Sequence, residues 1–78
     1  MWIEKDNQLV GTFEFDDFAA AFSFMTRIAL ISEKRSHHPD WTNCDNMVEI
    51  RLYTRFKGVT ISNKDRELAS IIESIYHQ

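Results

Sequence analysis

Cysteine, proline and glycine are all scarce in this chain of 78 residues. Cys44 is the only cysteine, so no disulfide can form within the chain, and the composition fits a reducing cytosol. One proline and two glycines leave no segment of low complexity, and there are no internal repeats. The length allows one domain, which we place at residues 1–78.

Long apolar runs are also absent. No uncharged apolar stretch reaches the ~18 residues that a membrane-spanning helix requires. The N-terminal segment carries Glu4, Lys5 and Asp6 where a secretory leader would be apolar. We therefore expect a soluble, cytoplasmic protein with no leader and no membrane partner.

Positive charge is not concentrated on any stretch. Nine Lys and Arg residues stand against twelve Asp and Glu residues, which gives a net charge of −3. Direct nucleic-acid binding usually requires a face rich in Lys and Arg. The one short cluster, Lys34 and Arg35 with nearby Arg27, fits the dipole-favoured end of a helix. We expect no direct nucleic-acid partner.

Large apolar side chains, by contrast, are plentiful. The chain has six Phe, two Trp and two Tyr residues. A lone core of this size rarely supplies more than about 3–5 kcal/mol of stability. Because self-association would bury the surplus, we predict a homo-oligomer, either a homodimer or a homotetramer.

Hydrophobic spacing predicts the order strand, strand, helix, strand, strand, helix. The expected ranges are 2–5, 9–15, 18–35, 47–54, 59–61 and 63–76, with residues 39–46 as a polar loop. Asp16 or Asp17 should cap the first helix, and Ser62 with Asp65 forms an acidic variant of the capping box before the second. The fold class is α+β: a two-layer sandwich of a four-stranded antiparallel sheet with two helices on one face.

The first predicted helix has an unusually wide apolar stripe. One row reads Phe18, Phe22, Met25, Ala29 and Ser32, and the row beside it reads Ala21, Phe24, Ile28 and Ile31. We assign the stripe to the core, since such helices are more often core than cofactor sites. Its excess width indicates that part of it packs on another subunit.

Residues 33–43, EKRSHHPDWTN, carry the strongest functional signal. His37 and His38 are adjacent, Pro39 stiffens the backbone after them, and Trp41 offers a flat aromatic face. Histidine exchanges protons near neutrality because its unperturbed pKa is about 6.5. The pattern suggests proton transfer on a small planar substrate. The alternative is a helix cap followed by a turn.

A metal site built from His37, His38 and Cys44 is disfavoured. Adjacent histidines diverge on a regular backbone, and neither CxxC nor HxxxH spacing occurs. We expect no metal.

This segment also resembles a known family signature. Glu33, the run from His37 to Asn43, Asn46 and the alternating Val48–Leu52 are similar to the pterin-4a-carbinolamine dehydratases, also known as dimerization cofactors of a homeodomain transcription factor. The similarity covers nearly the whole chain, through Trp2, Phe13–Phe18, Phe22, Phe24, Met25, Thr54, Gly58, Thr60, Asp65, Leu68 and Ala69.

The resemblance implies a hydro-lyase of tetrahydrobiopterin recycling. Its members dehydrate 4a-hydroxytetrahydropterin to the quinonoid dihydropterin, which needs a general acid near the 4a hydroxyl and a base near N5. The pterin is the substrate, and no cofactor is required. No residue points to a homeodomain partner.

Motif matching assigns the site residues. His37 and His38 take the places of the family's active-site pair, His37 for proton transfer and His38 for orienting the pterin. The substrate-binding candidates are Glu33, Pro39, Trp41, Arg55 and Asp65.

Three of these candidates have a second interpretation. Glu33 would hold the imidazole of His37, or it is a solvated helix residue. Trp41 would wall the pocket, or it packs its segment on the sheet. Asp65 matches a family acidic position, but capping alone explains it.

Two positions depart from the family pattern. Arg55 stands where the family carries a third histidine, and a guanidinium with a pKa above about 12 cannot act as a base. It could still donate hydrogen bonds or stabilise developing negative charge. Asp45 replaces an aromatic residue, and we expect both substitutions around the pocket.

These departures leave three hypotheses open. The first is a dehydratase, weakened by Arg55. The second is a catalytically inactive pterin-binding or protein-interaction paralogue. The third is a purely structural role without affinity for pterins.

Overall fold

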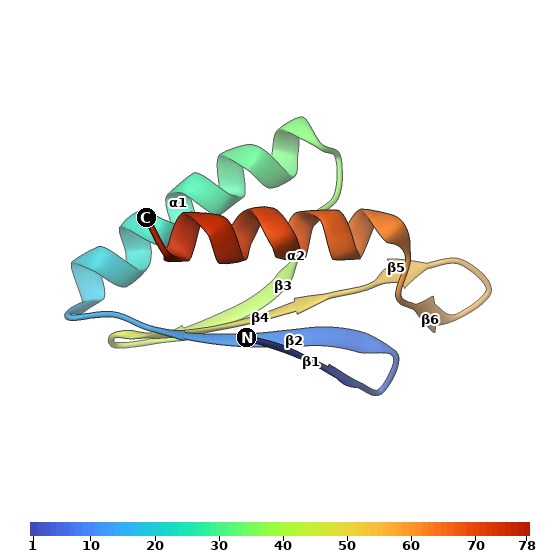
Figure 1. The fold of residues 1–78 in the computed structure, drawn as a ribbon, viewed down its shortest axis with the longest axis horizontal. Helices are drawn as coiled ribbons and strands as arrows, with labels where there is room; N and C mark the ends of the chain where they lie inside the picture. The colour runs from blue at the N-terminus through green and yellow to red at the C-terminus, as the bar shows by residue number, and fades with distance from the viewer.

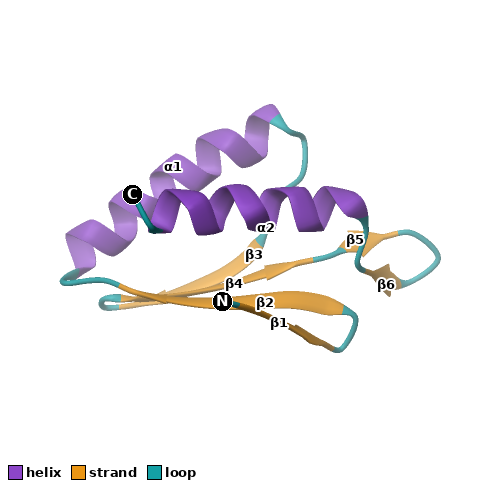
Figure 2. Cartoon of the chain, in the orientation of Figure 1, coloured by secondary structure: helices purple, strands orange, loops and turns teal.

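The computed structural model describes all 78 residues as two helices on one face of an antiparallel sheet (Figure 1). The elements in chain order are β1 (Trp2–Lys5), β2 (Gln8–Glu14), α1 (Phe18–Lys34), β3 (Asp40–Cys44), β4 (Met47–Leu52), β5 (Thr54–Arg55), β6 (Val59–Thr60) and α2 (Asn63–Tyr76). The main sheet has the strand order β1-β2-β4-β3, and β5 pairs with β6 in a separate hairpin near the start of α2 (Figure 2). The predicted fold class is confirmed.

The fourth strand of the main sheet is not the one predicted. Residues 39–46 were expected to form a polar loop, but Asp40–Cys44 forms an edge strand, with Trp41 paired to Ile50 of β4. The strand was missed because most of its residues are polar. It has a short period-2 pattern, in which Trp41 and Asn43 are half-buried between exposed neighbours. Val59–Thr60 pairs only with β5, outside the main sheet.

The helix ends agree with the capping signals. The Asp17 carboxylate accepts from the Ala20 amide at 2.8 Å and starts α1. Ser62 and Asp65 form the predicted capping box at the start of α2. Neither helix is long and apolar enough to cross a membrane.

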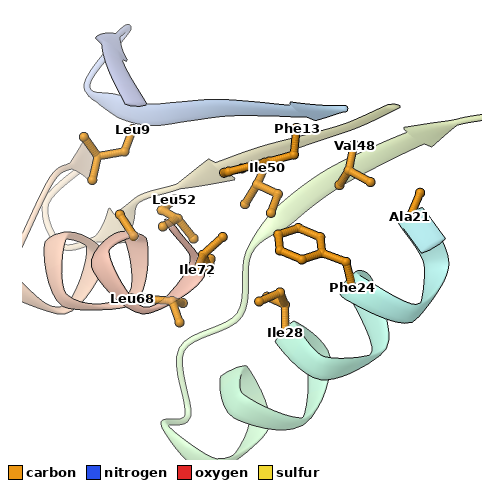
Figure 3. Packing of buried hydrophobic residues seen from close by; sticks show 11 residues of the cluster. Leu9, Phe13, Ala21, Phe24, Ile28, Val48, Ile50, Leu52, Leu68 and Ile72 are labelled. Atoms are coloured by element: carbon orange, nitrogen blue, oxygen red, sulfur yellow. The ribbon is translucent and has the colours of Figure 1, made fainter. Parts of the chain in front are cut away.

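The core lies between the helices and the inner face of β2 and β4 (Figure 3). Its eleven buried residues are Leu9, Phe13, Ala21, Phe24, Ile28, Val48, Ile50, Leu52, Leu68, Ala69 and Ile72. Fully burying one large side chain of this kind stabilises the fold by about 1.5–3 kcal/mol. Of the two predicted rows on α1, the one with Ala21, Phe24 and Ile28 faces this core, whereas Phe18 and Phe22 of the other stay more than half exposed.

Candidate active site

The loop between α1 and β3 positions the two histidines. Arg35 ends α1, and Ser36 adopts a left-handed backbone conformation with φ 52°, which turns the chain back towards the sheet. The His37 amide then donates to the Ser32 carbonyl at 3.1 Å. This turn directs His37 towards the start of α2 and leaves His38 near solvent.

His37 is bound by a carboxylate that is completely buried. Its Nε2 contacts Oδ1 of Asp65, whose side chain is 0% exposed, and the His37 side chain itself is 13% exposed. The neutral imidazole donates from Nε2 to Asp65, which leaves Nδ1 as a proton acceptor. Asp65 therefore selects the tautomer and orientation of His37.

The two oxygens of Asp65 have different partners. Oδ2 accepts from the Ser62 amide at 2.9 Å, the Ser62 hydroxyl at 3.2 Å and the Thr54 hydroxyl at 2.8 Å. Oδ1 is left for His37. The predicted capping role and a contact with His37 that was not predicted thus occur in one side chain.

The pKa of Asp65 is lowered. Burial alone would raise this pKa, but the hydrogen bonds from the Ser62 amide, His37 and Thr54, together with the charge of His37, outweigh the burial. The carboxylate is therefore ionised at neutral pH and can stabilise a positive charge on His37.

His38 has a more open environment. Its Nε2 lies 2.9 Å from Oε1 of Glu33, and the side chains are 64% and 81% exposed respectively. Of the two interpretations of Glu33, the contact with His37 does not occur, because α1 ends at Lys34 and the chain turns at Ser36; Glu33 is exposed and contacts His38. Residues 33 and 37 therefore do not share a helical face.

Both histidines line one polar cavity of about 280 Å³. Its seven lining residues are Ser36, His37, His38, Asp40, Tyr53, Thr54 and Arg55. Small-molecule pockets typically measure about 300–1,000 Å³, so this cavity lies just below that range and has room for no more than one small ligand.

A chain of hydrogen bonds forms one side of this cavity. The Tyr53 hydroxyl donates to Oδ2 of Asp40 at 2.5 Å and accepts from Nη2 of Arg55 at 3.0 Å. The Arg55 guanidinium also lies over the Tyr53 ring, 5.2 Å from its centroid. Arg55 is thus at the cavity, as its place in the motif indicated.

Five of the residues singled out from the sequence do not line this cavity: Glu33, Pro39, Trp41, Asp45 and Asp65. Trp41 contacts the core and borders a separate apolar hollow beside α1, so it packs its segment on the sheet. Pro39 is half-buried and acts through the backbone of the loop. Asp45 lies in the β3–β4 turn, at the other end of the sheet from β5, so the expectation that it borders the pocket is wrong (Figure 1).

Ser36, Asp40, Tyr53 and Thr54 line the cavity but were not predicted as site residues, and Tyr53 is the one that contacts Arg55. Tyr53 and Arg55 stand two residues apart in an extended segment, so their side chains project to the same side. Thr54 projects to the other side, towards Asp65. This alternation was the available signal.

No three His, Cys, Asp or Glu side chains are grouped where they could hold a metal ion. Cys44 is exposed at the end of β3 next to the β3–β4 turn.

Known proteins are similar to this chain in sequence and in fold. A family model described as pterin 4 alpha carbinolamine dehydratase matches residues 1–75. A protein of Prochlorococcus marinus, named "Putative pterin-4-alpha-carbinolamine dehydratase", is 47% identical over 77 residues, which cover 99% of this chain and 79% of that protein. A protein of the same name from Rhizorhabdus wittichii is 48% identical over 64 residues, 82% of this chain and 65% of that protein.

Two solved structures have the same fold. The crystal structure of a transcriptional coactivator/pterin dehydratase from Brucella melitensis has a TM-score of 0.90 and 34% identity, over 96% of this chain and 81% of that one. A pterin dehydratase-like protein, identified as a RuBisCO assembly factor in the alpha-carboxysome, has a TM-score of 0.77 and 22% identity, over 97% of this chain and 87% of that one. The second likeness is of fold alone. Together, the family model and the close relatives show that this chain belongs to the pterin 4 alpha carbinolamine dehydratase family.

Proposed function

We propose that this protein dehydrates 4a-hydroxytetrahydropterin, with His37 as the proton-transfer residue and His38 as an orienting residue. The observation that carries the proposal is the pair of His37 and buried Asp65 at a polar cavity of about 280 Å³. A carboxylate that orients an imidazole towards a substrate pocket is a recurring device in acid–base catalysis.

The reaction removes water across the C4a–N5 bond. A proton added to the 4a hydroxyl lets the C4a–O bond break, the N5 lone pair forms the C4a=N5 double bond, and N5 then loses its proton. Starting as the imidazolium, His37 gives its Nδ1 proton to the departing hydroxyl and takes one back from N5, so the enzyme ends as it began. Nδ1 of His37 can accept the N5 proton, because Asp65 stabilises the resulting imidazolium.

The decay of enzymatically generated 4a-hydroxytetrahydropterin tests this proposal. His37→Ala should lower the dehydration rate at least ~10²-fold, since a positioned acid or base contributes ~10²–10⁴-fold. His77→Ala is the matched control, because His77 is exposed at the end of α2 and pairs with Glu73. Equal rates for the wild type and His37→Ala would end the proposal.

The second candidate is a pterin-binding or protein-interaction paralogue without catalysis. It is favoured by Arg55, which lines the cavity and cannot serve as a base. Arg55→His distinguishes the two candidates. If the wild type shows no activity and Arg55→His does, the wild type is an inactive paralogue. A wild type that is already faster than the uncatalysed reaction excludes this second candidate.

A further inference from the structure

The cation at the cavity has no acidic partner. Arg55 makes its one hydrogen bond to a neutral phenol, that of Tyr53. Of the other four arginines, Arg27 donates to the side-chain amide of Gln78, and three form ion pairs with carboxylates: Arg35 with Glu67, Arg51 with Glu49 and Arg66 with Glu4. In a chain with net charge −3, an arginine without a carboxylate therefore lies beside the imidazoles.

The Arg55 guanidinium is held in position on the side that faces Tyr53. Tyr53 supports its flat face at 5.2 Å and accepts from Nη2, while Asp40 anchors the Tyr53 hydroxyl. Nε and Nη1 have no partner in the protein. Arg55 thus presents free donors in a preorganised orientation, which lowers the entropy cost of binding a ligand.

The acidic groups around the cavity are already engaged. Asp65 is buried behind His37, Glu33 contacts His38, and Asp40 accepts from Tyr53. None of them forms an ion pair with Arg55. Asp40 keeps its negative charge at the cavity, but it is linked to Arg55 only through the Tyr53 hydroxyl, so the guanidinium has no carboxylate in direct contact when an anion enters.

The structure of a pterin indicates which of its groups could contact Arg55 as an anion. In a pterin, the ring carbon C6 is bonded to N5 and carries the variable substituent. A histidine acting at N5 therefore has this substituent beside it, and Arg55 lines the same cavity. Carboxylate and phosphate match the planar fork of a guanidinium.

We propose that Arg55 binds an anionic C6 substituent, so that this protein prefers acidic pterins to neutral ones. The inference rests on the proposed pterin site and adds the class of substrate to it.

Calorimetry with ligands that share one ring tests this preference. The probes are 6-hydroxymethylpterin, which is neutral in its side chain, its phosphate ester, and pterin-6-carboxylate; inorganic phosphate alone shows whether the ring is needed. The wild type should bind at least one anionic pterin about tenfold more tightly than the neutral one. The preference should weaken as salt is added, because the cation is exposed.

Arg55→Gln should bring the dissociation constants of the neutral and anionic pterins together, and Arg55→Lys should retain part of the difference. Arg35→Gln, which removes an ion-paired arginine outside the cavity, should retain it fully.

The possible outcomes separate the two proposals. Equal affinities of the wild type for all three pterins, or a preference that survives in Arg55→Gln, would overturn the inference and leave the proposed function standing. Inorganic phosphate binding as tightly as the phosphate ester would also overturn it, since the ring would then contribute nothing. No binding of any pterin would overturn both.

Discussion

The carboxylate of Asp65 joins three parts of the molecule that are distant in sequence. It accepts from Ser62 at the start of α2, from Thr54 of β5 and from His37 of the loop after α1. A buried acceptor with several donors costs much to remove, because each donor then lacks a partner away from water. This residue therefore serves both the stability of the fold and the orientation of His37.

Asp65→Asn should lower the free energy of unfolding by about 2–3 kcal/mol, because the charge that several buried donors share is lost. The dehydration rate should also fall, since His37 loses its anionic partner. Urea unfolding and the decay assay measure the two effects. Asp17→Asn is the matched control: Asn caps a helix about as well as Asp, so stability should change by less than ~0.5 kcal/mol and activity should stay the same.

The lowered pKa of Asp65 makes this contribution dependent on pH. A carboxyl group whose pKa is depressed on folding stabilises the protein above its unfolded value, here 3.8, and this stabilisation is lost as the pH falls through the folded pKa. The stability difference between the wild type and Asp65→Asn should thus be full at pH 7 and shrink below about pH 4. Urea midpoints at pH 7, 5 and 3 measure it, and a difference that stays constant would contradict the argument.

Single residues of the site were predictable to unequal degrees. His37 and His38 were predicted because they lie in one contiguous motif. Arg55 was predicted because it replaces a histidine of the family pattern. The contact of His37 with Asp65 spans 28 residues, so no local spacing reveals it. Capping alone already explained Asp65 from its local sequence. Capping uses one oxygen of the carboxylate, however, and the second oxygen can accept a further hydrogen bond.

Among the elements, β3 is the strand that was predicted as a loop. Helices α1 and α2 have clear caps and long periodic stripes, and their boundaries were predicted closely. The five residues of β3 are mostly polar, because this strand has one neighbour and only one side chain, Trp41, packed against the core. Pairing with β4 decides its structure, and pairing partners are not visible in a local pattern.

The β1–β2 pair offers a test at the same scale. Gly11 of β2 lies opposite Trp2 of β1, and a Cβ on Gly11 would come within 2.8 Å of two indole carbons. Gly11→Ala should displace Trp2 and lower stability by about 1–3 kcal/mol, with a shift in tryptophan fluorescence.

A double-mutant cycle with Trp2→Ala identifies the cause. The cost of Gly11→Ala should fall once the indole is absent, leaving only the closer approach to Cε2 of Phe13 at 3.0 Å. A cost that is the same in both backgrounds would place the strain elsewhere.

For the molecule as a whole, the outer side of α1 carries an exposed aromatic pair. Phe18 and Phe22 are 56% and 53% exposed, and their ring centroids are 5.8 Å apart. Phe22 also borders the apolar hollow of about 310 Å³ beside Trp41. A core of only eleven residues would gain from covering this surface, which supports the predicted homo-oligomer.

Light scattering over a range of concentrations measures the mass of the assembly. The wild type should be larger than one chain, and Phe22→Asp should shift the mass towards the monomer. Phe56→Asp is the control, because Phe56 is equally apolar and 70% exposed but lies in the turn between β5 and β6. A wild type that stays monomeric at every concentration would contradict the prediction.

The central claim is that His37 and Asp65 act as one unit in proton transfer to and from a pterin. The most direct measurement compares dehydration rates of the wild type, His37→Ala, Asp65→Asn and the double variant under conditions where all four are folded. Residues that act as a unit lose their contribution together, so the double variant should be no slower than His37→Ala alone. If the rate loss of the double variant equals the product of the two single losses, the claim is contradicted. A wild-type rate no faster than the uncatalysed reaction would also contradict it.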